Sequence, residues 1–395
     1  MLFRSDALDA FRVANRAVRD ALARRITGGD PPAWRAFQLA FILLTLPAIA
    51  TPGDPMAGRE AVDLLFFPTG GGKTEAYLGL AAFTMVLRRL RARGASGEVG
   101  VGGAGVAVFM RYTLRLLTLD QLGRAAGLVC ALELIRSADP RRYGTWPFEI
   151  GLWVGQAATP NVIGRAGDGN ANSARAKLAA FQANPNGRPS PVPLEECPWC
   201  ATKFTPASFT IREAGGSATL EIRCADPGMA CDFQGARALP IVGVDEPIYR
   251  RLPAFLVATV DKFASLPWVG PSGAILGGAS RHDAGGFYGP SEPGIGAPLD
   301  RPLAPPDLVI QDELHLISGP LGTMAGLYET AIDALCTREV DGVAIRPKLV
   351  ASTATVRQAL TQVQALFARP QTLIDRKSTR LNSSHVSESR MPSSA

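Results

Sequence analysis

The chain has 395 residues, of which 47% are hydrophobic and 19% are charged, and its net charge is +6. This hydrophobic fraction is enough for a buried core and excludes an intrinsically disordered protein, while the length allows two domains or one large α/β domain with insertions. The positive charge fits a nucleic-acid partner, although the sequence has no long run of like charge.

The N-terminal residues lack the apolar segment of a signal peptide, and the apolar run 37–46 is too short to span a bilayer. We therefore expect a cytoplasmic protein with no membrane contact. Residues 6–25 and 32–46 have the apolar spacing of two helices, which predicts a helical N-terminal extension over residues 1–60.

A glycine-rich turn lies between an apolar run that ends at Phe67 and a helix-like segment that begins at Glu75. The turn consists of Thr69, Gly70, Gly71, Gly72, Lys73 and Thr74. Such a turn lets backbone N–H groups approach a polyphosphate, while its lysine supplies a positive charge and its last threonine a hydroxyl for Mg²⁺. The sequence therefore predicts a site for ATP and Mg²⁺. The alternative is a glycine-rich turn that binds nothing.

The second half of this site is expected after the apolar strand 307–311, where Asp312 and Glu313 follow. At the end of a strand, the first carboxylate can hold Mg²⁺, and the second can orient the attacking water for phosphoryl transfer. His315 suits coupling between the ATP site and its neighbours, because its ring can donate and accept hydrogen bonds at once. Together with Lys73, these side chains are the predicted catalytic residues.

Four cysteines have nearly the spacing of a structural zinc ribbon. They are Cys197, Cys200, Cys224 and Cys231. Two thiolate pairs are what a tetrahedral Zn²⁺ ion requires, although the second pair is spaced more loosely than usual. We expect a zinc module within an insertion over residues 164–240. Buried cysteines without a metal are the alternative.

Strands and helices alternate over residues 61–374, which predicts an α/β domain with a parallel central sheet. The stretch 270–306 is rich in Gly and Pro, and we expect a long loop without its own core. Residues 375–395 lose the apolar periodicity and are predicted to be a disordered tail. They resemble the translation of a short-read sequencing adapter, so we expect the native protein to continue past Ile374.

Several runs resemble superfamily 2 helicases, and the longer ones resemble the DrmA helicase subunits of bacterial DISARM anti-phage systems. The runs are FFPTGGGKTEAYLGLAAFT, MRYTLRLLTLDQ, CPWC, ATVDKFASLPW, LVIQDELHLISGPLGT and ASTATV. The resemblance implies a RecA-like P-loop domain, ATP-driven action on DNA and the DISARM partner protein DrmB. It also implies a second RecA-like domain, absent from this sequence, that supplies an arginine finger for phosphoryl transfer.

The resemblance assigns further roles to residues at the ends of predicted strands. Those predicted to contact DNA are Arg111, Thr113, Arg115, Thr259 and Lys262. Those predicted to relay the nucleotide state are Ser352, Thr353 and Thr355, and Gln38 is predicted to read adenine. The alternatives are a helix N-terminus with surface arginines, a helix cap at Thr355, and a glutamine on the surface or at a cap.

The predicted function is that of an ATP-dependent DNA helicase or translocase of anti-phage defence, of which this chain carries the ATP-binding half. The competing interpretation is a nucleotide-gated DNA-binding or signalling ATPase that does not unwind strands. A third possibility is that the zinc module is mainly a docking surface for a partner protein.

Overall fold

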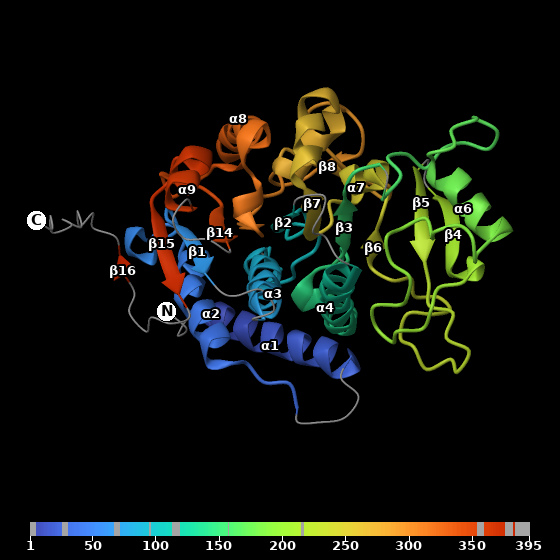
Figure 1. The fold of residues 1–395 in the computed structure, drawn as a ribbon, viewed down its shortest axis with the longest axis horizontal. Helices are drawn as coiled ribbons and strands as arrows, with labels where there is room; N and C mark the ends of the chain where they lie inside the picture. The colour runs from blue at the N-terminus through green and yellow to red at the C-terminus, as the bar shows by residue number, and fades with distance from the viewer. Residues whose placement is uncertain are drawn as a thin grey trace, which may run out of the picture.

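The computed structural model describes residues 5–25, 31–66, 72–94, 96–112, 119–156, 158–214, 217–353, 359–375 and 382–383. At its centre is a nine-stranded sheet with the strand order β16-β15-β1-β14-β11-β2-β7-β3-β6 (Figure 1). Every pair in this sheet is parallel except β15 with β16. The predicted α/β class with a RecA-like parallel sheet is confirmed.

The strands of the central sheet are β1 (Val62–Phe66), β2 (Val108–Tyr112), β3 (Ile150–Trp153), β6 (Ile241–Val242), β7 (Phe255–Thr259), β11 (Leu308–Gln311), β14 (Lys348–Ser352), β15 (Gln371–Asp375) and β16 (Asn382–Ser383). The helices are α1 (Ser5–Arg25), α2 (Ala36–Ala50), α3 (Lys73–Arg91), α4 (Leu119–Ala138), α5 (Pro140–Tyr143), α6 (Ala174–Ala183), α7 (Asp245–Arg251), α8 (Gly319–Cys336) and α9 (Ala359–Phe367). Three small sheets contain β4 (Phe209–Ala214) with β5 (Ser217–Ile222), β8 (Arg281–Asp283) with β9 (Gly286–Tyr288) and β10 (Ala297–Pro298), and β12 (Arg338–Val340) with β13 (Val343–Ile345). Short 3₁₀ helices are η1 (Pro55–Ala57), η2 (Pro206–Ser208), η3 (Val260–Trp268), η4 (Gly270–Leu276) and η5 (Leu314–Leu316).

Helices cover both faces of the central sheet (Figure 1). α1 to α4 pack on one face, and α7 to α9 with η3 and η4 pack on the other. The buried side of α1 is mostly alanine, including Ala7, Ala10 and Ala14, so this helix can lie close against α3 and α4. The two predicted N-terminal helices are therefore part of the main core. None of the described helices is long and apolar enough to cross a membrane.

The expected insertion at 164–240 contains a helix as well as the cysteines. α6 forms in its first part, and Oγ of Ser173 accepts a hydrogen bond from the backbone N–H of Ala176 at 3.2 Å to cap it. Phe181 of this helix packs edge-on against Phe209 of the β4–β5 hairpin, with ring centroids 5.7 Å apart. The buried apolar face of α6, which also includes Ala174 and Leu178, belongs to the main core cluster.

The stretch 270–306 is not the loop without a core that its composition suggested. It forms η4 and the small sheet β10-β8-β9. Phe287 and His282 of this sheet pack against Trp146, at ring-centroid distances of 4.8 Å and 5.6 Å. The expectation of a loop was wrong, because aromatic contacts with the distant Trp146 bury side chains of this stretch and support its regular structure. In the expected tail, Asn382–Ser383 pair with β15, and most other residues lie outside the described ones.

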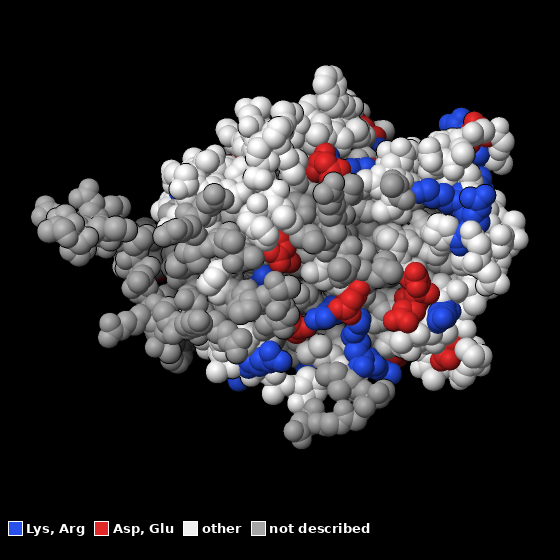
Figure 2. Space-filling model, in the orientation of Figure 1, with Lys and Arg blue, Asp and Glu red and all other residues white. Residues whose placement is uncertain are grey.

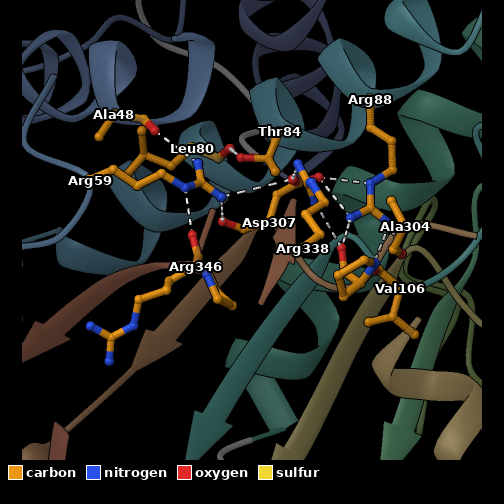
Figure 3. A network of polar contacts seen from close by, with 12 residues as sticks. Ala48, Arg59, Leu80, Thr84, Arg88, Val106, Ala304, Asp307, Arg338 and Arg346 are labelled. Atoms are coloured by element: carbon orange, nitrogen blue, oxygen red, sulfur yellow. Dashed lines mark hydrogen bonds and ion pairs between the residues drawn. The ribbon is translucent and has the colours of Figure 1, made fainter. Parts of the chain in front are cut away.

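Asp307, directly before β11, binds three arginines at the amino-terminal edge of the sheet (Figure 3). Nε of Arg88 donates to Oδ2 of Asp307 at 2.8 Å, and Nη2 of Arg338 donates to Oδ1 at 2.6 Å. Nη2 of Arg59 lies 3.9 Å from the same Oδ1. Burial alone would raise the pKa of Asp307, but the three guanidinium charges outweigh it and hold this pKa well below its usual range.

These arginines also donate to backbone carbonyls from separate parts of the chain. Arg59 donates to the carbonyl oxygens of Ala48 at 2.8 Å and Arg346 at 2.6 Å. Arg88 donates to the carbonyl oxygen of Val106 at 2.9 Å. The cluster therefore joins the segment before β1, the end of α3 and the start of β11, which are the elements that carry the predicted nucleotide residues at their other ends.

The variant Asp307→Asn keeps the shape of the side chain and leaves Arg59, Arg88 and Arg338 without their carboxylate. We expect the free energy of unfolding to fall by about 3 to 5 kcal/mol, as when one partner of a buried ion pair is removed. Urea unfolding at pH 7 measures this loss. The control Asp300→Asn removes an exposed carboxylate and should change the free energy by less than about 0.5 kcal/mol.

The pH dependence provides a second check on the same variant. The pKa of Asp307 is lower in the folded protein than in the unfolded chain, where it is about 3.9. Its stabilising contribution is therefore complete above about pH 4 and is lost as the pH falls below that value. The stability difference between wild type and Asp307→Asn should shrink from about pH 4 downward. A difference that is small at pH 7, or constant in acid, would contradict the assigned role of this carboxylate.

Candidate functional site

The predicted nucleotide residues meet at the carboxyl-terminal edge of the sheet. β14 lies between β1 and β11, and all three run parallel. Leu65 of β1 pairs with Ser352 of β14, and Gln311 of β11 pairs with Ala351. This register brings the start of α3, which follows β1, close to the carboxylates that follow β11. Ligands of open parallel α/β sheets bind at this edge.

Gly72, Lys73 and Thr74 are the part of the predicted phosphate loop that the structure describes, whereas Thr69, Gly70 and Gly71 lie outside the described residues. Gly72 has φ of +86° at the N-terminus of α3, and a Cβ there would lie 2.7 Å from Nε2 of Gln38. A residue other than glycine would be both strained and crowded at this position. Lys73 is buried, and its Nζ lies 3.4 Å from Oε1 of Glu313. Thr74 follows, half-buried, in the first turn of α3.

Asp312 and Glu313 are held by Ser352, the hydroxyl residue at the end of β14. Oγ of Ser352 donates to Oδ1 of Asp312 and accepts from the backbone N–H of Glu313 at 3.2 Å. Burial raises the pKa of Asp312, although the hydrogen bond from Ser352 and the charge of Lys73 act against it. Glu313 has φ of +47°, a strained conformation for a residue other than glycine and one found often at functional sites.

The other residues predicted for coupling lie around these carboxylates. Thr353 is buried, and its N–H donates to the carbonyl of Leu65 in β1 at 3.2 Å. Nδ1 of His315 lies 3.4 Å from Oε2 of Glu313. Thr355 lies outside the described residues. Ser352, Thr353 and His315 thus touch the residues or strands of the nucleotide site, and their role in coupling stays a prediction.

Gln38 is buried in the first turn of α2 and is not a surface residue. Its Oε1 accepts from the backbone N–H of Arg35 at 2.9 Å, and its Nε2 donates to the carbonyl of Gly72 at 2.8 Å. The side chain therefore caps α2 and ties this helix to the phosphate loop. Recognition of adenine by Gln38 remains a prediction.

These residues line a cavity of about 1060 Å³, at the upper end of the range for ligand pockets. Gln38, Lys73 and Glu313 form one side, and arginines of α1, among them Arg12 and Arg16, form another. The glycine cradle, the lysine and the two carboxylates fit the phosphates of ATP and a Mg²⁺ ion by their chemistry.

Sequence reasoning missed two contributors to this site. The α1 side of the cavity was missed because helix–helix packing, which no local motif encodes, brings α1 to the site. Tyr77 of α3 was also missed, although it lies one helical turn beyond Lys73 and is fully buried. Burial and the charge of Asp312 raise the pKa of the Tyr77 hydroxyl well above its usual value.

Two of the residues predicted to contact DNA, Arg111 and Lys262, form buried ion pairs. Both terminal nitrogens of Arg111 donate to the carboxylate of Glu329 in α8, and Arg111 is almost completely buried. Nζ of Lys262 lies 2.6 Å from Oδ2 of Asp245 and donates to Oδ1 of Asn161 at 3.0 Å. Neither cation lies at an open surface, so contact with DNA would require these pairs to separate.

Of the other residues predicted to contact DNA, the one that the structure describes is also buried. Thr259 is buried at the end of β7, and Thr113 and Arg115 lie outside the described residues. The alternative of surface arginines is wrong for Arg111. The sequence did contain a sign that Arg111 has a carboxylate partner. Glu329 and Asp333 are the only charged residues of α8, and isolated carboxylates in an apolar helix often pair with a buried cation.

The four predicted cysteines form one cluster, and their sulfur atoms all lie within 4.8 Å of one another. The Cys200 and Cys224 sulfurs are 3.4 Å apart, and the Cys197 and Cys231 sulfurs are 3.9 Å apart. Four thiolates bound to one Zn²⁺ at 2.3 Å would be separated by about 3.8 Å. The donor set and its spacing therefore fit a tetrahedral zinc ion.

The cysteine cluster packs against the helices of the main core. The Arg24 guanidinium of α1 lies over the ring of Trp199, 4.9 Å from its centroid. Nε1 of Trp199 donates to Oδ2 of Asp232 at 2.7 Å, and this carboxylate also pairs with Arg24 at 3.4 Å. Cys130 of α4 and Cys336 of α8 are buried in the core, as expected. The segment that carries the cysteine cluster thus packs against α1, one of the helices that line the cavity.

The strand order and the converging strand ends define the chain as an α/β protein of the RecA-like type. Over 350 residues it is 39% identical to the DISARM protein DrmA of Bacillus paralicheniformis, a match that covers 85% of this chain. The chain is therefore a homologue of DrmA, as its motifs indicated, and it spans 30% of that relative's length. No family model matches the chain.

Among solved structures, the chain is similar to the crystal structure of the DUF1998 helicase MrfA bound to DNA. The TM-score is 0.42 and the sequence identity 10%, over 91% of this chain and 29% of the other. This likeness is too distant to assign roles to individual residues.

The cysteine cluster gives a direct test. We expect purified protein to carry about one zinc ion per chain, and the double variant Cys197→Ser, Cys200→Ser to carry none, measured by elemental analysis. Because the cluster supports α1 and α4, the variant should also unfold at a Tm lower by about 5 °C or more. The control Cys336→Ala removes a buried thiol outside the cluster and should retain the zinc. Purified wild-type protein that contains no zinc would contradict the assignment.

Proposed function

We propose that this chain is the ATP-binding half of an ATP-dependent DNA helicase or translocase of anti-phage defence. The observation that carries the proposal is the position of Lys73 opposite Glu313, 3.4 Å apart, beside a cavity of about 1060 Å³. A cation from the strand-to-helix turn and a carboxylate pair from a strand two places away are the two halves that phosphoryl transfer requires.

The proposed roles follow from the position of each side chain. Mg-ATP, when bound, supplies the phosphoryl group that is transferred to water. Lys73 and Thr74 would hold the phosphates and the Mg²⁺ ion, and Asp312 would hold the same ion through its carboxylate. Glu313 would orient the attacking water, and its strained backbone directs its side chain toward Lys73. Ser352 would link the Asp312 carboxylate to the backbone N–H of Glu313, since its hydroxyl bonds to both.

Homology to DrmA supports the biological part of the proposal. It suggests DNA as the substrate, the DISARM protein DrmB as a partner, and a second RecA-like domain in the portion that this chain does not span. That domain would supply an arginine to the transferring phosphoryl group, a contribution of about 10³ to 10⁵ in rate. The proposed zinc ion is structural and takes no part in the reaction.

A second candidate function is a nucleotide-gated DNA-binding or signalling ATPase that does not unwind strands. The buried pairs of Arg111 with Glu329 and of Lys262 with Asp245 favour it. If DNA binds only after these pairs separate, a nucleotide-dependent movement could control binding without translocation.

Substitutions of Lys73 and Glu313 test the nucleotide site. Lys73→Ala should weaken binding of Mg-ATP by about 10- to 100-fold, because it removes hydrogen bonds to charged oxygens worth 1.5 to 3 kcal/mol. Glu313→Gln should bind at least as well as wild type, since it keeps the shape and removes a negative charge. Titration calorimetry with a nonhydrolysable ATP analogue measures both. The control Glu60→Gln changes an exposed carboxylate outside the cavity, and equal binding by Lys73→Ala and this control would contradict the site.

A comparison of ATP hydrolysis by this chain and by a full-length DrmA tests whether an arginine from a second domain is needed. We expect this chain alone to hydrolyse ATP slowly, and a full-length DrmA to be about 10³-fold faster or more with DNA, because an arginine supplied across the cleft stabilises the transition state. Strand displacement by the full-length protein, with the Lys73→Ala equivalent as the inactive control, separates the two candidate functions. DNA-stimulated ATPase activity without strand displacement favours the gated module. Rapid DNA-stimulated turnover by this chain alone would overturn the need for a second domain.

A further inference from the structure

The outer face of α8 is apolar. The described residues include fifteen exposed large hydrophobic side chains, and eight of them lie between residues 316 and 360. Four of these belong to α8 and form the α8 stripe, which consists of Leu321, Met324, Leu327 and Leu335. The others are Leu316 on η5, Val340 and Val343 on the β12–β13 hairpin, and Leu360 on α9.

The charges of α8 all lie on its inner face. Its two charged residues are Glu329, which pairs with Arg111, and Asp333, which pairs with Arg346 and Arg369. The surface over α8 in Figure 2 accordingly shows neither blue nor red. A helix that ordinarily faces solvent carries charged side chains on its outer side. α8 therefore lacks the outer face of a solvated helix.

The degree of exposure separates this stripe from ordinary surface apolar residues. Leu327 is 64% exposed and Leu335 is 62% exposed, and both lie on the same helix as two further exposed apolar side chains. Single exposed leucines are common on soluble proteins, whereas a group of them on one element marks an interaction surface. An uncharged surface offers nothing to the phosphates that dominate affinity for DNA, so the occupant is expected to be a protein.

We propose that the α8 stripe is the docking surface for a further domain of the same polypeptide, from the portion of a DrmA-length protein that this chain does not span. The chain accounts for 30% of the length of its relative, so most of that polypeptide is available to cover the stripe. Interfaces between permanently associated parts are more apolar than transient ones and have few charges at their centre.

The position of α8 gives this contact a consequence for the site. The helix begins at Gly319, shortly after Glu313 and His315, and its Glu329 holds Arg111. A domain docked on the outer face of α8 is therefore in contact with one element that links the nucleotide site to a predicted DNA-binding cation. Movement of that domain could therefore shift α8 and affect both the nucleotide site and Arg111 without direct contact with them.

Thiol labelling tests the proposal in proteins of both lengths. In this chain, Leu327→Cys and the control Met56→Cys, which replaces a side chain that is 91% exposed, should both react rapidly with a maleimide, with the unsubstituted protein as the blank. In full-length DrmA of Bacillus paralicheniformis, a cysteine is introduced at the position aligned with Leu327 or with Met56. The first should react at about one tenth of its rate in this chain or more slowly, while the second should not be slowed.

The remaining outcomes overturn the proposal. Equal labelling of the Leu327 position in both proteins means that no domain covers it, and charged residues at the aligned positions of the relative would exclude an apolar interface. Protection that disappears on dilution would assign the stripe to a second copy of the chain. Slowing at both positions would show general protection and no specific surface.

A lysine at the centre of the stripe provides an independent measurement. Leu327→Lys should leave the Tm of this chain nearly unchanged, because the side chain is 64% exposed. The aligned substitution in full-length DrmA should lower the Tm by about 3 °C or more, because it places a charge in a covered apolar interface. Equal effects in the two proteins would overturn the docking surface.

Discussion

The carboxylate of Asp307 and its three arginines are the constraint on which the proposed nucleotide site depends. Asp307 stands at the start of β11, Arg88 lies near the end of α3, and Arg59 precedes β1. Each of these elements leads, at its opposite end, to a residue predicted to bind the nucleotide. Because strands and helices are stiff, fixing one end of each element fixes the separation of Lys73 and Glu313 at the other.

α8 lies between the proposed ATP site and a residue predicted to contact DNA. It follows the carboxylate pair, it holds Arg111 through Glu329, and its outer face is uncharged. Arg111 and Lys262 are both paired in the arrangement that the structure shows. A further domain on the apolar face of α8, as proposed, would set the position of this helix and, through Glu329, that of Arg111.

Motifs that need only neighbours in sequence could be predicted well. Lys73 follows its glycines directly, Asp312 and Glu313 follow their strand, and each cysteine pair lies within a short segment. Partners far apart in sequence could not be predicted. Glu329 meets Arg111 across 218 residues, and Asp307 meets Arg88 across 219. Composition also misled at 270–306, because the aromatic core of this stretch comes in part from Trp146.

The sequence by itself determined the α/β class, the helix that begins at Lys73, the carboxylates after β11 and the four cysteines, because each rests on local spacing and backbone chemistry. Only the tertiary structure decided that Arg111 and Lys262 are paired with carboxylates. Arg111 and Lys262 resemble exposed DNA contacts in the sequence, yet burial makes a charge costly unless a carboxylate is beside it. Glu329 and Asp245 are that compensation, and packing of distant elements alone brings them there.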